Sequence, residues 1–192
     1  MAKLVLFVSV SLDGVMQGPG RPDEDTRDGF AHGGWAAPYA DAGTGAAAAE
    51  GGATSGAILL GRRTYLDFFS VWPHRTDNPF TEVLNNTQKY VVSRSLTDDL
   101  PWQNSSLLRG VADVAAVKQR LDRDIVLLGS GELARSLMDA GLIDTYTLLI
   151  HPLVLGSGTR LFPPAGPDRK LDLVRSTATS SGVVIATYQP AA

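Results

Sequence analysis

The sequence predicts an α/β fold in three layers, with a mostly parallel sheet between helices and antiparallel strands added at the C-terminal end. β-rich and helical segments alternate up to residue 140, a pattern typical of parallel strands joined by helices. The apolar segments after residue 140 are β-rich, and the last has no helix after it. The chain has 192 residues, of which 44% are hydrophobic. This is enough to predict one packed domain over residues 1–192.

The predicted strands are short runs of β-branched, aromatic and aliphatic residues that end at glycine or polar turns. Residues 3–10 are almost unbroken in apolarity, which predicts a strand buried on both faces. The other predicted strands are residues 57–60, 89–93, 107–108, 125–128, 145–154 and 183–188.

The predicted helices follow from apolar spacing. Val111, Val114, Val117 and Leu121 recur on one face of a helix. Residues 14–34 are rich in glycine, proline and aspartate, which predicts a long loop. Helices are also predicted within the alanine-rich residues 35–52, at residues 63–69 and at residues 132–140.

Composition narrows the classes of function. The formal net charge of −3 provides no general attraction to nucleic acid or to an anionic membrane, so a bound phosphate needs a local site. The chain contains no cysteine, which excludes disulfides, thiolate metal sites and cysteine nucleophiles. The histidines lack metal-ligand spacing, and the first apolar run is too short for a membrane or secretory segment. We therefore expect no metal, no nucleic-acid or membrane partner, and a cytoplasmic location.

A glycine-rich motif lies between a predicted strand and a predicted helix. Residues 129–134 (GSGELA) fit the pattern G-x-G-x-x-G/A. Glycine lets the backbone approach a phosphate, and the N–H groups and dipole of the helix start stabilise negative charge. The alternative is a tight turn without a ligand. A Rossmann unit would need a further parallel strand ending in an acidic residue, and the β-rich tail disfavours that assignment.

Arginine and hydroxyl side chains follow two other predicted strands. Residues 61–64 (GRRT) start a helix, and residues 93–95 (SRS) end the next strong strand. Guanidinium groups there can hold phosphate by charge-assisted hydrogen bonds, although a solvated basic turn is the alternative. The carboxyl ends of parallel strands share one edge of the sheet, so these turns could converge on one elongated anion. Arginine and serine in place of an acidic residue favour NADP over NAD.

Short motifs follow one another in a specific order along nearly the whole chain: residues 11–14 (SLDG), 60–65 (LGRRTY), 89–94 (KYVVSR), 128–131 (LGSG) and 152–158 (PLVLGSG). By the order and spacing of these motifs, the chain resembles the dihydrofolate-reductase-like superfamily. It is most similar to the branch that includes the reductase domain of the bacterial bifunctional riboflavin-biosynthesis deaminase-reductase and its single-domain relatives. The resemblance implies a dihydrofolate-reductase-like sheet and an NADPH-dependent reductase.

The resemblance also implies where each part of NADPH binds. Nicotinamide would lie near the first strand, the diphosphate over the turns at Gly61 and Gly129, and the 2′-phosphate near Ser93 and Arg94. Residues 18–34 and 43–56 do not reproduce the acidic pterin-binding helix of true dihydrofolate reductases, so the substrate stays open. The residues predicted to bind the cofactor are Gly61, Arg62, Arg63, Thr64, Ser93, Arg94, Gly129, Ser130, Gly131, Glu132 and Leu133.

The resemblance also implies that Asp13 lies at the substrate end of the cleft, and Trp35, after the long loop, is a second candidate there. Asp13 follows the first strand, where it could bind substrate N–H groups or pass a proton during reduction. The alternative is a turn residue, because Asp-Gly is a strong turn dipeptide. Trp35 could line a ring-binding pocket, or it could belong to the core, as large aromatic residues often do.

These observations predict hydride transfer from NADPH to a small pterin- or pyrimidine-like substrate, similar to a riboflavin precursor. The alternative is a module that binds NADP or another nucleotide but has little or no turnover. We also expect a homodimer, because the resemblance implies one and because residues 145–154 and 183–188 would otherwise expose an apolar edge.

Overall fold

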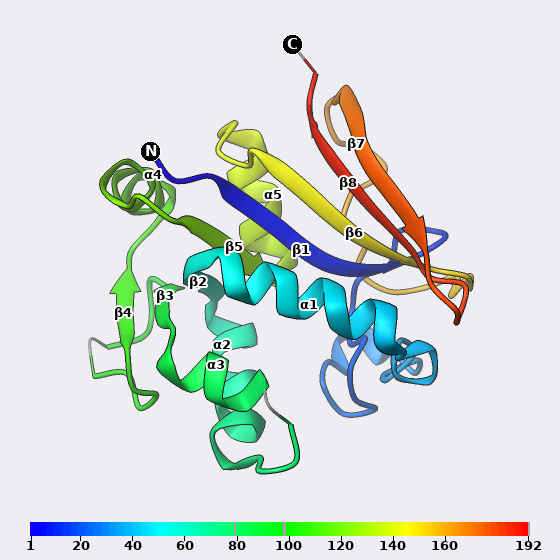
Figure 1. Cartoon of the computed structure of the whole chain (residues 1–192), viewed down its shortest axis with the longest axis horizontal. Helices are drawn as coiled ribbons and strands as arrows, with labels where there is room; N and C mark the ends of the chain where they lie inside the picture. Colours follow the sequence, from blue (N-terminus) through cyan, green and yellow to red (C-terminus); the bar gives the residue numbers. More distant parts are fainter. Residues whose placement is uncertain (79, 98, 192) are drawn as a thin grey trace.

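An eight-stranded mixed sheet forms the centre of the protein, with strand order β4-β3-β2-β5-β1-β6-β8-β7 (Figure 1). The structure is a computed structural model that describes residues 1–78, 80–97 and 99–191. The strands from β4 to β6 are parallel, while β8 pairs antiparallel with both β6 and β7. The strands are β1 (Leu4–Ser11), β2 (Ser55–Gly61), β3 (Gln88–Val92), β4 (Ser105–Leu108), β5 (Asp124–Leu128), β6 (Thr145–His151), β7 (Leu171–Ala178) and β8 (Val184–Pro190).

Helices cover both faces of this sheet, which confirms the predicted fold class (Figure 1). In β2, Leu59 packs in the hydrophobic cluster that contains α4 and α5, while Leu60 packs in the cluster of α2 and α3. Neighbouring residues of a strand point to opposite faces, so these helix groups lie on opposite sides. The helices are α1 (Ala42–Thr54), α2 (Arg62–Val71), α3 (Phe80–Asn86), α4 (Val111–Arg120) and α5 (Gly131–Asp139), with 3-10 turns at Arg27–Gly29, Ala37–Tyr39 and Trp72–His74.

Strand β1 lies between β5 and β6 and is buried on one face only. Leu4, Leu6 and Val8 have exposures of 0%, 0% and 4% and pack toward α5. Phe7 and Ser9, on the opposite face, are half-buried and line a cleft. The prediction of burial on both faces is therefore wrong, because a cleft lies between this face of the strand and helix α1.

The predicted strands and helices are all present, with ends shifted by a few residues, but two elements were not predicted. Helix α3 covers residues with mixed polarity, and β7 alternates poorly, so neither has a clear apolar period. Strand β7 pairs with β8 and becomes the outer edge of the sheet. The expectation that residues 145–154 and 183–188 would form an exposed edge is therefore wrong, because β6 and β8 each have a neighbour on both sides. The exposed apolar side chains of the edge are instead Leu173 and Val174 of β7, each 56% exposed.

Candidate functional site

A cleft with a volume of about 1130 Å³ lies at the carboxyl edge of the parallel strands. Small-molecule sites have volumes of ~300–1,000 Å³, so this cleft has room for an extended ligand. All of the residues predicted to bind cofactor line it, from β2, β3 and β5 and the turns that follow them. Strand order explains this convergence, since β3, β2 and β5 are neighbours and end at the same edge.

Three helices begin at this cleft without a side chain that caps their first N–H groups. Their N-cap residues are Gly61 for α2, Gly110 for α4 and Ser130 for α5, and none makes a side-chain capping hydrogen bond. An uncapped helix start presents backbone donors and the positive end of the helix dipole. The site can therefore bind negative groups at several points along its length.

The hydroxyl group of Ser130 joins the two glycine turns. It accepts a hydrogen bond from the backbone N–H of Gly61 at 2.8 Å and donates to Oγ1 of Thr64 at 2.9 Å. Ser130 has a left-handed backbone, with φ 62°, and Gly129 before it has φ 55°. This conformation turns the Ser130 side chain from β5 toward α2, so the starts of α2 and α5 are held together.

The turn after β3 is held from two sides by arginines. The Ser93 hydroxyl accepts hydrogen bonds from the backbone N–H groups of Ser95 and Leu96 at 3.2 and 3.1 Å. Nη1 of Arg62 donates to the Ser95 hydroxyl at 2.9 Å, and Nη1 of Arg109 donates to the Leu96 carbonyl at 2.8 Å. The prediction from sequence missed Arg109, although Arg109-Gly110 follows a short strand and starts a helix, as Gly61-Arg62 does.

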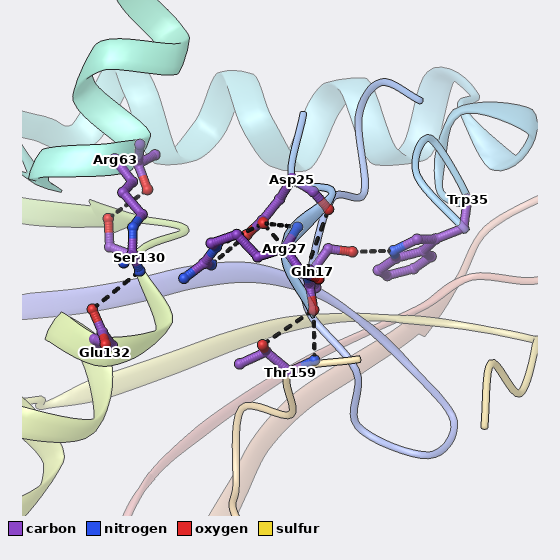
Figure 2. Close-up of polar contacts among 9 residues, drawn as sticks. Gln17, Asp25, Arg27, Trp35, Arg63, Ser130, Glu132 and Thr159 are labelled. Carbon is purple, nitrogen blue, oxygen red and sulfur yellow. Dashed lines mark hydrogen bonds and ion pairs between the residues drawn. The ribbon is translucent and has the colours of Figure 1, made fainter. Parts of the chain in front are cut away.

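Arg94 is exposed on the cleft lining, next to this turn. Arg63, from α2, lies across the cleft from Glu132 of α5, with Nη1 and Oε2 3.4 Å apart (Figure 2). Their side chains are 61% and 78% exposed, so this ion pair contributes little stability and a ligand can displace it.

The structure places Asp13 outside the residues that line the cleft. Its carboxylate accepts hydrogen bonds from the Ser11 hydroxyl at 2.7 Å and from the backbone N–H groups of Leu155 and Gly156 at 3.1 and 3.0 Å. Arg160 adds an ion pair at 3.3 Å. These hydrogen bonds, that from Ser11 first, lower the pKa of Asp13 to about 2. This position favours the turn interpretation, in which Asp13 anchors the segment after β6.

Trp35 also lies outside the cleft lining and is 6% exposed. Its Nε1 donates to the backbone carbonyl of Gln17 at 2.7 Å (Figure 2). Its ring meets that of His151 edge to face at 5.1 Å. Its position favours the core interpretation. The residue that it supports, Gln17, does line the cleft. Nothing in its sequence surroundings marks Gln17, because its partners lie in distant parts of the chain.

The end of the cleft near β1 has an apolar floor and a wall of small residues. Phe7 and Ser9 come from β1, and Ala48 and Gly51 come from α1. A Cβ atom added to Gly51 would lie 4.0 Å from the Phe7 ring. This end could accept a flat ring against Phe7. Over the described residues there is no group of three His, Asp or Glu side chains placed to hold a metal ion, and no helix there is long and apolar enough to cross a membrane.

The chain matches the family model of the RibD C-terminal domain over residues 2–185. It belongs to the RibD C-terminal domain family. Membership confirms the resemblance found in the sequence and supports a reductase-type function. The chain is also similar to the uncharacterized protein YyaP of Bacillus subtilis strain 168. The two are 31% identical over 139 residues, which make up 68% of this chain and 72% of YyaP.

Solved structures similar to this RibD C-terminal domain protein have the same fold at low identity. A putative riboflavin biosynthesis protein from Shewanella sp. PV-4 has TM-score 0.70 and 19% identity, with both chains covered in full. A pyrimidine reductase-like protein from Corynebacterium diphtheriae has TM-score 0.67 and 14% identity, covering 100% of this chain and 92% of the other. Dihydrofolate reductase from Enterococcus faecalis, in complex with NADP(H) and RAB-propyl, has TM-score 0.64 and 14% identity, covering 99% and 97%.

Proposed function

We propose that this protein is an NADPH-dependent reductase of a small pterin- or pyrimidine-like substrate, and that residues 1–192 act as one domain. The observation that carries the proposal is the convergence of the uncapped starts of α2, α4 and α5 on one cleft. Arginines from the same turns add guanidinium groups along it: Arg62, Arg63, Arg94 and Arg109. A dinucleotide with an extra phosphate is an elongated anion of this kind.

The residues at each turn fit the parts of NADPH. The starts of α2 and α5 would hold the diphosphate by backbone N–H groups. A Cβ atom added to Gly131 would come within 2.9 Å of the Met16 sulfur, so a larger residue here would have to displace the Met16 side chain that lines the cleft. Ser93, Arg94 and Arg62 would hold the 2′-phosphate, and Phe7 would face the nicotinamide. NADPH, when bound, supplies the hydride.

The chain's own residues would orient the substrate and exclude water from it. Ala48 and Gly51 line the cleft from α1, whereas the carboxylate of that helix, Glu50, pairs with Arg175 of β7 at 2.9 Å. A substrate recognised by a carboxylate on this helix, as dihydrofolate would require, is therefore disfavoured against a pyrimidine-like one. We propose that Asp13 shapes the segment near Gly156 and passes no proton, because its carboxylate bonds to the backbone N–H groups of Leu155 and Gly156 and lies outside the cleft lining.

Titration of the protein with NADPH and NADH by fluorescence or calorimetry tests the cofactor. We expect tighter binding of NADPH by about tenfold or more, the scale of one charge-assisted contact. Cofactor oxidation is then measured with a panel of pterins and pyrimidines. Equal affinities or no binding would contradict the proposal. NADPH binding without turnover on any compound would favour the alternative of a nucleotide-binding module.

A further inference from the structure

The loop between β1 and α1 has a small hydrophobic core of its own. Val15, Phe30 and Trp35 are buried in it, with exposures of 0%, 7% and 6%. Gly158, from the segment after β6, packs so closely that an added Cβ atom would lie 2.6 Å from the Phe30 ring. The loop is therefore packed onto the sheet, and side chains that it sends into the cleft start from a fixed backbone.

Gln17 connects this loop to the segment after β6. Its side chain is almost completely buried, with 5% exposed. Its Oε1 accepts hydrogen bonds from the backbone N–H and the hydroxyl of Thr159 at 2.9 and 3.1 Å. Its Nε2 donates to Oδ1 of Asp25 at 3.2 Å and to the Arg27 carbonyl at 3.1 Å (Figure 2). Gln17 thus fixes both the backbone of Arg27 and the carboxylate next to it.

Asp25 in turn orients the guanidinium group of Arg27. Oδ1 accepts from Nε at 2.7 Å, and Oδ2 accepts from Nη2. The pair lowers the pKa of Asp25, so this carboxylate is ionised at neutral pH. Over the described residues, Nη1 of Arg27 has no hydrogen-bond acceptor, and the side chain is 44% exposed. Arg27 therefore has N–H donors available on the side away from Asp25.

These donors face the start of α5. Both Asp25 and Arg27 line the cleft, and Figure 2 shows the Arg27 guanidinium extending from Asp25 toward Ser130 and Glu132. The pKa of Arg27 is raised, first by the hydrogen bonds that it donates to Asp25 and further by the negative charges of Asp25 and Glu132. Arg63, on α2, also reaches this end of α5. An anion at the start of α5 could therefore contact Arg27 from the loop as well as donors from α2 and α5.

We propose that Arg27 binds the diphosphate of the dinucleotide from the loop side, with Asp25 and Gln17 as positioning residues. The inference rests on the proposed function, since it assigns a contact to that cofactor. The helix starts offer backbone donors to one side of the diphosphate, and Arg27 supplies oriented donors to another. A guanidinium group can keep its paired hydrogen bonds to Asp25 while its free N–H groups bind phosphate oxygens, which a lysine cannot do.

The test compares NADPH affinity in Arg27→Ala, Arg27→Lys and a matched control, Arg75→Ala. Arg75 pairs with Asp77, also two residues away, at 3.0 and 3.1 Å, but neither lines the cleft. We expect Arg27→Ala to weaken NADPH about tenfold or more, Arg27→Lys to restore it in part, and Arg75→Ala to have no effect. Adenosine 2′-monophosphate has no diphosphate, so its affinity should be unchanged in Arg27→Ala and reduced in Arg94→Ala.

A double-mutant cycle tests the positioning role of Gln17. If Gln17 acts through Arg27, Gln17→Met should weaken NADPH in the wild type and have a smaller effect in Arg27→Ala. If Gln17 has only a structural role, Gln17→Met should reduce NADPH affinity by the same factor in the wild type and in Arg27→Ala. Wild-type protein that binds no NADPH would refute the proposed function. Wild-type binding with Arg27→Ala equal to Arg75→Ala would leave that function intact and overturn this inference.

Discussion

The Ser130 hydroxyl joins the starts of α2 and α5 by two short hydrogen bonds, whereas the Arg63–Glu132 ion pair between them is longer and exposed, so Ser130→Ala tests the geometry of the cleft. The change removes the acceptor of the Gly61 N–H at 2.8 Å and the donor to Thr64 at 2.9 Å. Alanine is as disfavoured as serine at φ 62°, so the backbone strain stays similar. The measured effect should therefore come from the lost hydrogen bonds.

The expected magnitude follows from these bonds. A neutral hydrogen bond contributes a net ~0.5–1.5 kcal/mol, and a buried donor left without an acceptor costs ~1–3 kcal/mol. Because the turn borders the cleft, water can reach the freed Gly61 N–H and reduce that cost. We expect a loss of about 2 kcal/mol in the free energy of unfolding, which corresponds to a fall of roughly 4–8 °C in Tm for a domain of this size.

Urea unfolding of the wild type, Ser130→Ala and Ser70→Ala measures this effect. Ser70 is a matched control, because its hydroxyl donates to the Asp67 carbonyl of the same helix at 2.7 Å on an exposed surface of α2. Ser70→Ala should change stability by less than about 0.5 kcal/mol. Ser130→Ala should also weaken NADPH severalfold, because the two helix starts separate. The same stability in both variants would show that Ser130 does not hold the turns together.

Three further predictions concern the cofactor, Asp13 and the sheet edge. Arg94→Ala should weaken NADPH about tenfold and leave NADH unchanged, since only NADPH has the 2′-phosphate; calorimetry with both cofactors measures this, and an equal loss for both would remove Arg94 from that subsite. Asp13→Asn should reduce stability at neutral pH and leave NADPH affinity unchanged. Because folding lowers the pKa of Asp13 from 3.8 to about 2, the advantage of the wild type should be complete above pH 3.8 and be lost as the pH falls toward 2; an advantage independent of pH in urea unfolding would contradict this. Light scattering should give a dimer that Leu173→Glu, on the exposed edge strand β7, converts to a monomer, and a monomeric wild type would refute the dimer.

The prediction from the sequence was best where local pattern decides structure. Glycine after an apolar run correctly predicted where β2 and β5 end. The starts of α2 and α5, which follow directly, could also be predicted from neighbouring residues alone. Parallel strands share their carboxyl edge, so the side chains at those ends could be assigned to one site without knowledge of strand order. The sequence pattern also predicted antiparallel strands at the C-terminal end, which β7 and β8 form, but it counted residues 145–154 with them, whereas β6 pairs parallel with β1.

Only the tertiary structure decided which polar side chains reach the cleft. Asp13 appeared available in the sequence, but its carboxylate bonds to the backbone of Leu155 and Gly156, more than 140 positions away. Gln17 gained its position through Thr159, at a similar separation. Such contacts depend on how two distant loops pack beside β1 and β6, and no local spacing encodes them. Hydrogen bonds between segments that far apart therefore determine which residues line the cleft near β1, while local turn chemistry determines the residues at the ends of β2, β3 and β5.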